Sequence, residues 1–223
     1  MKTIILTAAY IIAGLAFIIS DYYSSIIPPL VLKALLIPVL MGVLLVNVRF
    51  PENKMHKLML AGLFFSWAGD IILGIPGSNP GFFIAGLASF LIAHLMYLTV
   101  FVITPGENAI SRRSPYQLFP VIVAGIALVA YLYKDLDGMR FPVIMYATVI
   151  LTMLAGAINR RMKVNTTSFW MVLAGAILFI ISDSTIAVNK FSHPFPSSGI
   201  VIMVTYITAQ YLIITGYIRQ FKS

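Results

Sequence analysis

The chain has 223 residues, of which 60% are hydrophobic and only 10% are charged, and its mean hydropathy is +0.97. Soluble domains are about 45–50% apolar and about 25% charged, so the composition excludes a soluble globular protein. The formal net charge is +8. The basic residues nevertheless lie in short clusters between apolar runs, which argues against a nucleic-acid partner. The chain has no cysteine, which excludes disulfides, thiolate catalysis and Cys-ligated metals.

Long apolar runs follow one another along the whole sequence, and a helix needs about 20 apolar residues to cross a bilayer. Breakers such as Pro51 and Pro105-Gly106 separate the runs. The expected spans are 3–20, 29–48, 57–74, 82–104, 116–133, 141–159, 168–188 and 199–219. We therefore expect an all-α polytopic membrane protein, in which residues 1–223 form one transmembrane domain of eight transmembrane helices.

The orientation follows from the positions of lysine and arginine, because short cytoplasmic loops carry an excess of both. Three basic residues, Lys134, Arg140 and Lys190, fall on one side of the expected membrane. The basic residues on the opposite side are Lys2, Arg49, Lys54, Lys57, Arg112, Arg113, Arg160, Arg161, Lys163, Arg219 and Lys222. The pattern predicts that both termini are cytoplasmic and that the protein lies in the cell (inner) membrane, with segments 21–28, 75–81, 134–140 and 189–198 facing outward.

A weak internal repeat relates the two halves of the chain. Gly62 and Asp70 recur as Gly175 and Asp183, at an offset of 113 residues. Because this offset covers four expected helices, it predicts two four-helix halves of parallel orientation. Further matching positions are Leu60-Ala61 with Leu173-Ala174, Lys33 with Tyr146, and, with three residues more, Phe90 with Tyr206 and Ala93-His94 with Ala209-Gln210.

Three charged residues lie inside the expected spans and away from the terminal residues of those spans, namely Lys33, Asp70 and Asp183. A charge near a helix centre costs about 2.5–3.5 kcal/mol on insertion scales, so such residues usually have a function. The topology places all three one to two turns from the outer ends of their helices, in one layer. The alternative is that Lys33 extends to the interface and that each aspartate only reaches water at a helix end.

Other polar and aromatic residues accompany these charges at helical spacing. The candidates for substrate binding are Lys33, Ser66, Phe90, His94, Tyr97, Tyr146, Ser182, Tyr206 and Gln210. His94 has a structural alternative, because a histidine in mid-membrane is often a hydrogen-bonded packing element. The three histidines, His56, His94 and His193, fall at different depths, so we expect no metal site. The chain also lacks the P-loop, GxSxG and HExxH motifs.

These residues resemble a known family. Lys33, Gly69-Asp70, Phe90-x-x-Ala93-His94-x-x-Tyr97, Ser182-Asp183 and Tyr206 with Gln210 look like the motifs of the YhhN-like lysoplasmalogenase family of integral membrane proteins. The resemblance covers nearly the whole chain, and its specificity lies in the order and spacing of short motifs. One departure is Ala34, since family members often have proline directly after the lysine; here Pro38 follows one turn later.

The resemblance implies hydrolysis of the vinyl ether bond of lysoplasmalogens, which yields a fatty aldehyde and a glycerophospho-base such as glycerophosphoethanolamine or glycerophosphocholine. It implies Asp70 and Asp183 as the catalytic pair, one protonated as general acid and the other ionised as base. Lys33 either keeps one aspartate ionised or binds the substrate phosphate. No cofactor is needed, and the expected partners are the lysophospholipid substrate and membrane lipid. We expect an apolar cavity lined by Phe90, Tyr97, Tyr146 and Met153, entered laterally from lipid, to accept the alkenyl chain.

Two other classes of function remain open at this point. Parallel repeats and the Lys33/Asp70/Asp183 cluster also describe an ion-coupled transporter of small molecules or lipids. A structural membrane protein, whose small residues such as Gly62 and Gly175 serve only helix association, is the third hypothesis.

Overall fold

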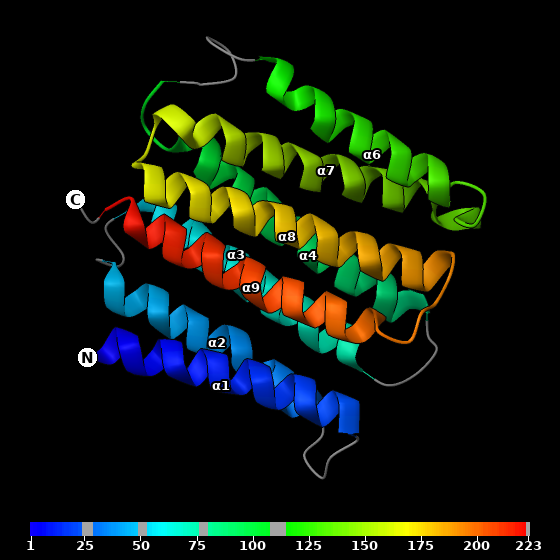
Figure 1. Ribbon diagram of the computed structural model, residues 1–223, viewed down its shortest axis with the longest axis horizontal. Helices are drawn as coiled ribbons and strands as arrows, with labels where there is room; N and C mark the ends of the chain where they lie inside the picture. The colour runs from blue at the N-terminus through cyan, green and yellow to red at the C-terminus, as the bar shows by residue number, and fades with distance from the viewer. Residues whose placement is uncertain (24–28, 49–52, 76–79, 108–114, 222–223) are drawn as a thin grey trace. The chain divides into compact units, whose positions relative to one another are not determined.

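A computed structural model describes residues 1–23, 29–48, 53–75, 80–107 and 115–221 (Figure 1). Within these ranges every regular element is helical, which confirms the expected all-α class. Some residues used in the sequence analysis lie outside the described residues, namely Arg49, Pro51, Arg112, Arg113 and Lys222.

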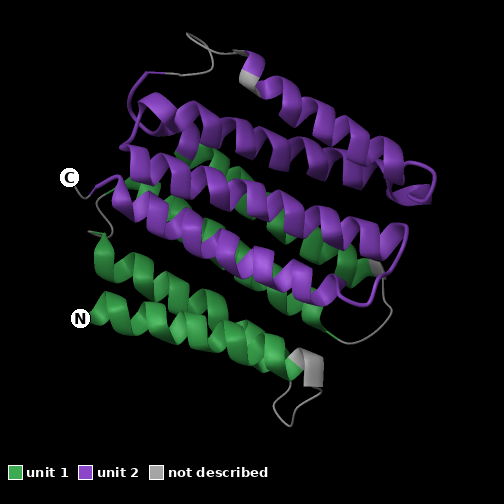
Figure 2. Cartoon of the chain, in the orientation of Figure 1, with its two compact units in different colours: residues 1–100 green, residues 101–223 purple. Residues whose placement is uncertain are grey.

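The chain divides into two compact units, Met1–Val100 and Phe101–Ser223 (Figure 2). The boundary falls in the last turn of α4, close to the middle of the sequence. Within the described residues the first unit contains four long apolar helices, and the second contains three together with the shorter apolar helix α6. We describe each unit by itself.

The first unit is built from α1 (Lys2–Tyr23), α2 (Pro29–Asn47), α3 (Lys54–Gly74) and α4 (Pro80–Ile103). Helices α2 and α4 begin at proline, whose fixed φ suits a first helical position and whose missing N–H is not needed there. Helix α3 begins after Asn53, whose side chain accepts a hydrogen bond from the Met55 amide at 2.8 Å. The starts of these helices therefore follow local sequence signals.

The second unit contains α6 (Phe119–Leu132), α7 (Arg140–Asn159), α8 (Thr166–Phe191) and α9 (Ser198–Arg219), with short 3₁₀ turns at Pro115–Leu118, Asp137–Met139 and Arg160–Met162. Helices α8 and α9 pack closely, because an ideal Cβ at Gly175 would lie 2.9 Å from the Ala209 carbonyl oxygen. Asn165 caps α8 and also donates to the Arg219 carbonyl at 2.9 Å, which fastens the start of α8 to the end of α9.

In the part of the chain that the structure describes, seven helices are long and apolar enough to cross a membrane, and the chain is an integral membrane protein. The element expected at 116–133 is the shorter exception, since α6 has 14 residues, or about 21 Å at about 1.5 Å per residue. The 3₁₀ turn that precedes α6 adds about 8 Å at about 2.0 Å per residue. Together they approach the hydrocarbon thickness of about 30 Å.

Arg160, one of the basic residues used to predict the orientation, has a fully buried side chain. Its Nη2 donates to Ser168 Oγ at 3.2 Å and to Gln220 Oε1 at 2.8 Å, and its guanidinium lies 5.2 Å from the centre of the Phe101 ring. These neutral acceptors hold the guanidinium inside the second unit, where a count of loop charges would not place it.

Candidate active site

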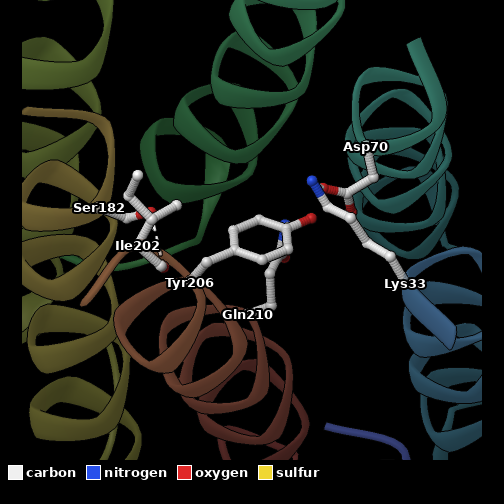
Figure 3. Close-up of polar contacts among 6 residues, drawn as sticks. All are labelled: Lys33, Asp70, Ser182, Ile202, Tyr206 and Gln210. Atoms are coloured by element: carbon white, nitrogen blue, oxygen red, sulfur yellow. Dashed lines mark hydrogen bonds and ion pairs between the residues drawn. The ribbon is translucent and has the colours of Figure 1, made fainter. Parts of the chain in front are cut away.

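A buried ion pair joins two helices in the described part of the first unit. Lys33 Nζ of α2 lies 3.2 Å from Asp70 Oδ1 of α3 (Figure 3). The Asp70 side chain is 2% exposed and the Lys33 side chain 17% exposed. Because a carboxylate buried this deeply is costly unless it is paired, the contact supports an ionised Asp70. The Lys33 ammonium group therefore has a carboxylate partner within the first unit.

A tryptophan fixes α2 beside α3 next to this pair. Pro38 lies inside α2 and has no N–H, so the carbonyl of Ala34, four residues earlier, loses its helical partner. Trp67 Nε1 of α3 donates to that carbonyl at 2.8 Å. Sequence analysis missed Trp67, although Pro38 was the available signal that a carbonyl beside Lys33 needed another donor.

Helix α4 packs closely on α3 at two glycines of α3, one about two turns before Asp70 and one directly before it. An ideal Cβ at Gly62 would lie 2.8 Å from Tyr97 Cδ1, and one at Gly69 would lie 2.7 Å from the Phe90 ring. Both aromatic rings therefore lie against α3 backbone, and Tyr97 is fully buried. Tyr97 and Phe90 therefore pack against α3. His94 on the same helix is fully buried.

Two further buried hydroxyl groups belong to the first unit. Ser66, one turn before Asp70, is fully buried, and its Oγ has no hydrogen-bond partner within the described part of the chain. Tyr10 of α1, which sequence analysis missed, is 1% exposed and lies within electrostatic reach of Asp70 and Tyr97. Its only sequence signal was a polar group in the middle of an apolar run.

The second unit holds the other candidate aspartate, Asp183, which is paired with a tyrosine. The Tyr146 hydroxyl of α7 donates a hydrogen bond to Asp183 Oδ2 of α8. Ser182, directly before this aspartate, donates from Oγ to the Ile202 carbonyl of α9 at 3.1 Å (Figure 3). The observed partner of Asp183 is thus a neutral phenol, whereas that of Asp70 is a cation.

Helix α9 contributes Tyr206 and Gln210, one turn apart. Gln210 Nε2 donates to the Tyr206 hydroxyl at 3.4 Å (Figure 3), and the Tyr206 ring meets the Phe179 ring edge-on at 5.5 Å. Gln210 is fully buried and Tyr206 is 3% exposed. The structure therefore joins these two candidates to each other.

The repeat found in the sequence extends to these contacts. Lys33 pairs with Asp70 in the first unit as Tyr146 pairs with Asp183 in the second. Gly62 packs on Tyr97, and its equivalent Gly175 packs on Ile213, which is 116 residues after Tyr97. Each unit thus brings an aspartate of its third helix to a side chain of its second helix. The expectation that the three charges share one layer stays a prediction.

Asp183 and Tyr146 line a cavity of about 140 Å³ between α6, α7 and α8, whose other walls are mostly apolar. Of the four residues expected to line a chain-binding cavity, Tyr146 does so here. Met153 is fully buried and does not line this cavity. It also does not line a larger groove that lies between α6 and α7. A carboxyl group at the wall of an apolar space can hold or move a proton next to a hydrocarbon, which is the chemistry that a general acid requires.

Comparison with known proteins identifies relatives across most of the chain. The chain is 36% identical to the bovine (Bos taurus) lysoplasmalogenase TMEM86A over 159 residues, which are 70% of this chain and 62% of that protein. It is 30% identical to the human (Homo sapiens) lysoplasmalogenase TMEM86B, over 78% of this chain and 69% of that protein. It is 27% identical to a Mycobacterium bovis lysoplasmalogenase, over 96% of this chain and 85% of that protein.

The match therefore spans less than two thirds of the bovine relative's length. The chain has no significant match among solved structures. A family model described as the YhhN family matches residues 29–217. This range includes the Lys33–Asp70 pair and the Tyr146–Asp183 pair. The chain belongs to the YhhN family.

Proposed function

We propose that the protein is a membrane hydrolase that cleaves the vinyl ether bond of lysoplasmalogens. The products are a fatty aldehyde and a glycerophospho-base, either glycerophosphoethanolamine or glycerophosphocholine. The relatives above bear the name lysoplasmalogenase, and they lend no support to the transporter alternative. The observation that carries the proposal is Asp183, which lies at the wall of an apolar cavity with Tyr146 bound to its carboxyl group.

The chemistry needs a proton donor more than a nucleophile. Protonation of the β-carbon of the vinyl ether gives an oxocarbenium ion, and water adds to its α-carbon after losing a proton to a base. The hemiacetal then collapses, so that the glycerol oxygen leaves with a proton and the former alkenyl chain leaves as the aldehyde. The reaction consumes one water, and it requires one acid and one base.

The partners of the two aspartates suggest how these roles are divided. Asp183 accepts a hydrogen bond from a neutral phenol and lines the apolar cavity, so we assign it the proton donation to carbon. Asp70 is paired with Lys33, so we assign it the role of the ionised carboxylate that balances the cationic intermediate and accepts the proton of water. Lys33 acts through Asp70 in this assignment and holds it ionised.

A panel of three substrates tests the function. The purified protein is incubated with a lysoplasmalogen, with the matching saturated alkyl ether lysolipid and with the matching acyl lysolipid. We expect aldehyde release from the vinyl ether alone, because only its β-carbon accepts a proton to give an oxocarbenium ion. Fatty acid release from the acyl lysolipid would identify an esterase instead, and turnover of none of the three would contradict the proposal.

A second readout follows the proton itself. Reaction in D₂O, with the aldehyde reduced to the alcohol as it forms, should leave one deuterium on the carbon next to the former carbonyl carbon. A product without carbon-bound deuterium would exclude protonation of the β-carbon.

A further inference from the structure

A second apolar space adjoins the Asp183 cavity within the second unit. This groove, of about 700 Å³, lies between α6 and α7 and is lined by both helices. The cavity and the groove share four wall residues, Gly125 and Val129 of α6 and Ala147 and Leu151 of α7. The two spaces therefore meet along one line of contact between these helices.

The wall between the two spaces is thin and made of small or movable groups. Gly125 is buried, and an ideal Cβ there would overlap Leu151 Cδ1, so the leucine side chain fills the space that the glycine leaves. Leu151 lines both spaces, so its side chain is part of the wall between the groove and the cavity. Ile122 and Ile126, which line the groove, are 54% and 65% exposed, so the groove opens sideways between α6 and α7.

The length of the groove suits a single hydrocarbon chain. Its walls extend along α7 from Ile144 to Ala155 and on the α6 side from Leu118 to Tyr133. Eleven residue steps on α7 correspond to about 17 Å at about 1.5 Å per residue. Half of a hydrocarbon core about 30 Å thick is about 15 Å, which is the depth that one lipid chain occupies in its leaflet.

The polar groups are distributed as an amphiphile requires. At one end of the groove the Arg140 guanidinium lies 4.6 Å from the centre of the Tyr133 ring, and Tyr133 lines the groove. Arg140 borders the groove through this contact, and Lys134, Asp135 and Asp137 lie in the same turn. Asp183 and Tyr146 open into the cavity at the same end of α7, whereas the groove toward Ala155 is mostly apolar. Its two threonines, Thr148 and Thr152, donate their hydroxyl protons to carbonyls of their own helix.

We infer that the groove between α6 and α7 binds the hydrocarbon chain of a single-chain phospholipid, with the phosphate at the Arg140 end and the chain running toward Ala155. This inference rests on the proposed function, because it places the bond next to the glycerol beside Asp183. It predicts that two residues of α7, Ala147 and Ala155, determine how far a chain enters the groove and which chain lengths are accepted. They lie on one face of α7, two turns apart.

Binding is tested without turnover, by photocrosslinking. The probe is an alkyl ether lysophosphatidylethanolamine with a diazirine at the chain end, and it is incubated with the protein in phosphatidylcholine nanodiscs. We expect crosslinks near Ala155 and Leu118, and an excess of the unlabelled alkyl ether lysolipid should suppress them. Crosslinks confined to the opposite, lipid-facing side of α6, or insensitive to the competitor, would overturn the inference.

Two substitutions and a matched control refine the test. Ala147→Phe fills the junction of groove and cavity and should abolish the competed crosslink. Ala127→Phe adds the same ring to an exposed position of α6 that lines neither space and should label like the parent. Ala155→Phe should lower kcat/KM for long-chain vinyl ethers by about tenfold or more while sparing short chains, which is the discrimination expected of an apolar pocket. Equal loss for all chain lengths would contradict the placement of the chain end.

The outcomes separate this inference from the proposed function. Crosslinks in the groove that the competitor suppresses, found without any aldehyde release, would support the binding site and refute the proposed hydrolase activity. Aldehyde release with crosslinks elsewhere would retain the hydrolase and refute the groove.

Discussion

Removal of the Lys33 charge tests whether this lysine holds Asp70 ionised. At a separation of 3.2 Å and an effective dielectric constant of about 20, the gross attraction is about 5 kcal/mol. The net contribution is smaller, because both groups lose water. Lys33→Met keeps the length of the side chain and leaves Asp70 buried beside an apolar group, which should lower the free energy of unfolding by about 3–5 kcal/mol.

The companion variants complete a double-mutant cycle. Asp70→Asn combined with Lys33→Met removes both charges, and the pair should cost about 2 kcal/mol less than the sum of the single variants. Tyr146→Phe is the matched control at the repeat-equivalent position, since it deletes one hydroxyl and no charge, and it should cost only about 1 kcal/mol. Equilibrium unfolding in mixed micelles measures the free energy of unfolding of the two single variants of the cycle, of the double variant and of Tyr146→Phe. Additive losses in the cycle would refute the idea that Lys33 and Asp70 act as a pair.

Three further predictions concern orientation, packing and His94. In intact cells an impermeant thiol reagent should label Gly138→Cys and leave Arg161→Cys unlabelled, since the basic clusters predict these two positions on opposite sides; the reverse pattern would invert the topology. Gly62→Ala should lower stability by about 1–3 kcal/mol, because the new Cβ overlaps the buried tyrosine ring that packs there. Gly42→Ala, whose nearest neighbour would be 3.5 Å away, should gain up to about 1 kcal/mol in the same unfolding assay. His94→Gln keeps a donor and an acceptor and should lose less than about 10²-fold in turnover; complete inactivity of the folded variant would show that His94 transfers protons.

Much of the fold could be predicted from the sequence, because hydropathy and helix breakers are local. The spans follow from the length of the apolar runs, and the helix starts at Pro29 and after Asn53 follow from proline and capping chemistry. The cost of an intramembrane charge singled out Lys33, Asp70 and Asp183, and the offset of the repeat related Tyr146 to Lys33. The contacts of Lys33 with Asp70 and of Tyr146 with Asp183 were not predicted and come from the structure.

Other features depend on packing, which no local pattern contains. The apolar run at 116–133 indicates a helix whether or not that helix packs tightly. Hydropathy therefore could not show that Leu151 fills the space at Gly125, or that the groove and the cavity both lie beside these residues. The positive-inside count treats each arginine alike, and it could not show that Ser168 and Gln220 supply acceptors that bury Arg160. These residues are distant in sequence and meet only in the folded unit.

The most direct test of the account is kcat/KM for vinyl ether cleavage by Asp70→Asn and Asp183→Asn. Asparagine preserves size and hydrogen bonding but carries no titratable proton, so each variant should fold like the parent and lose at least about 10²-fold in activity. Because the two carboxyl groups are proposed to serve one reaction, the double variant should be little worse than either single one. If both single variants release aldehyde at near-parental rates, neither aspartate is catalytic and the assignment of the site is wrong.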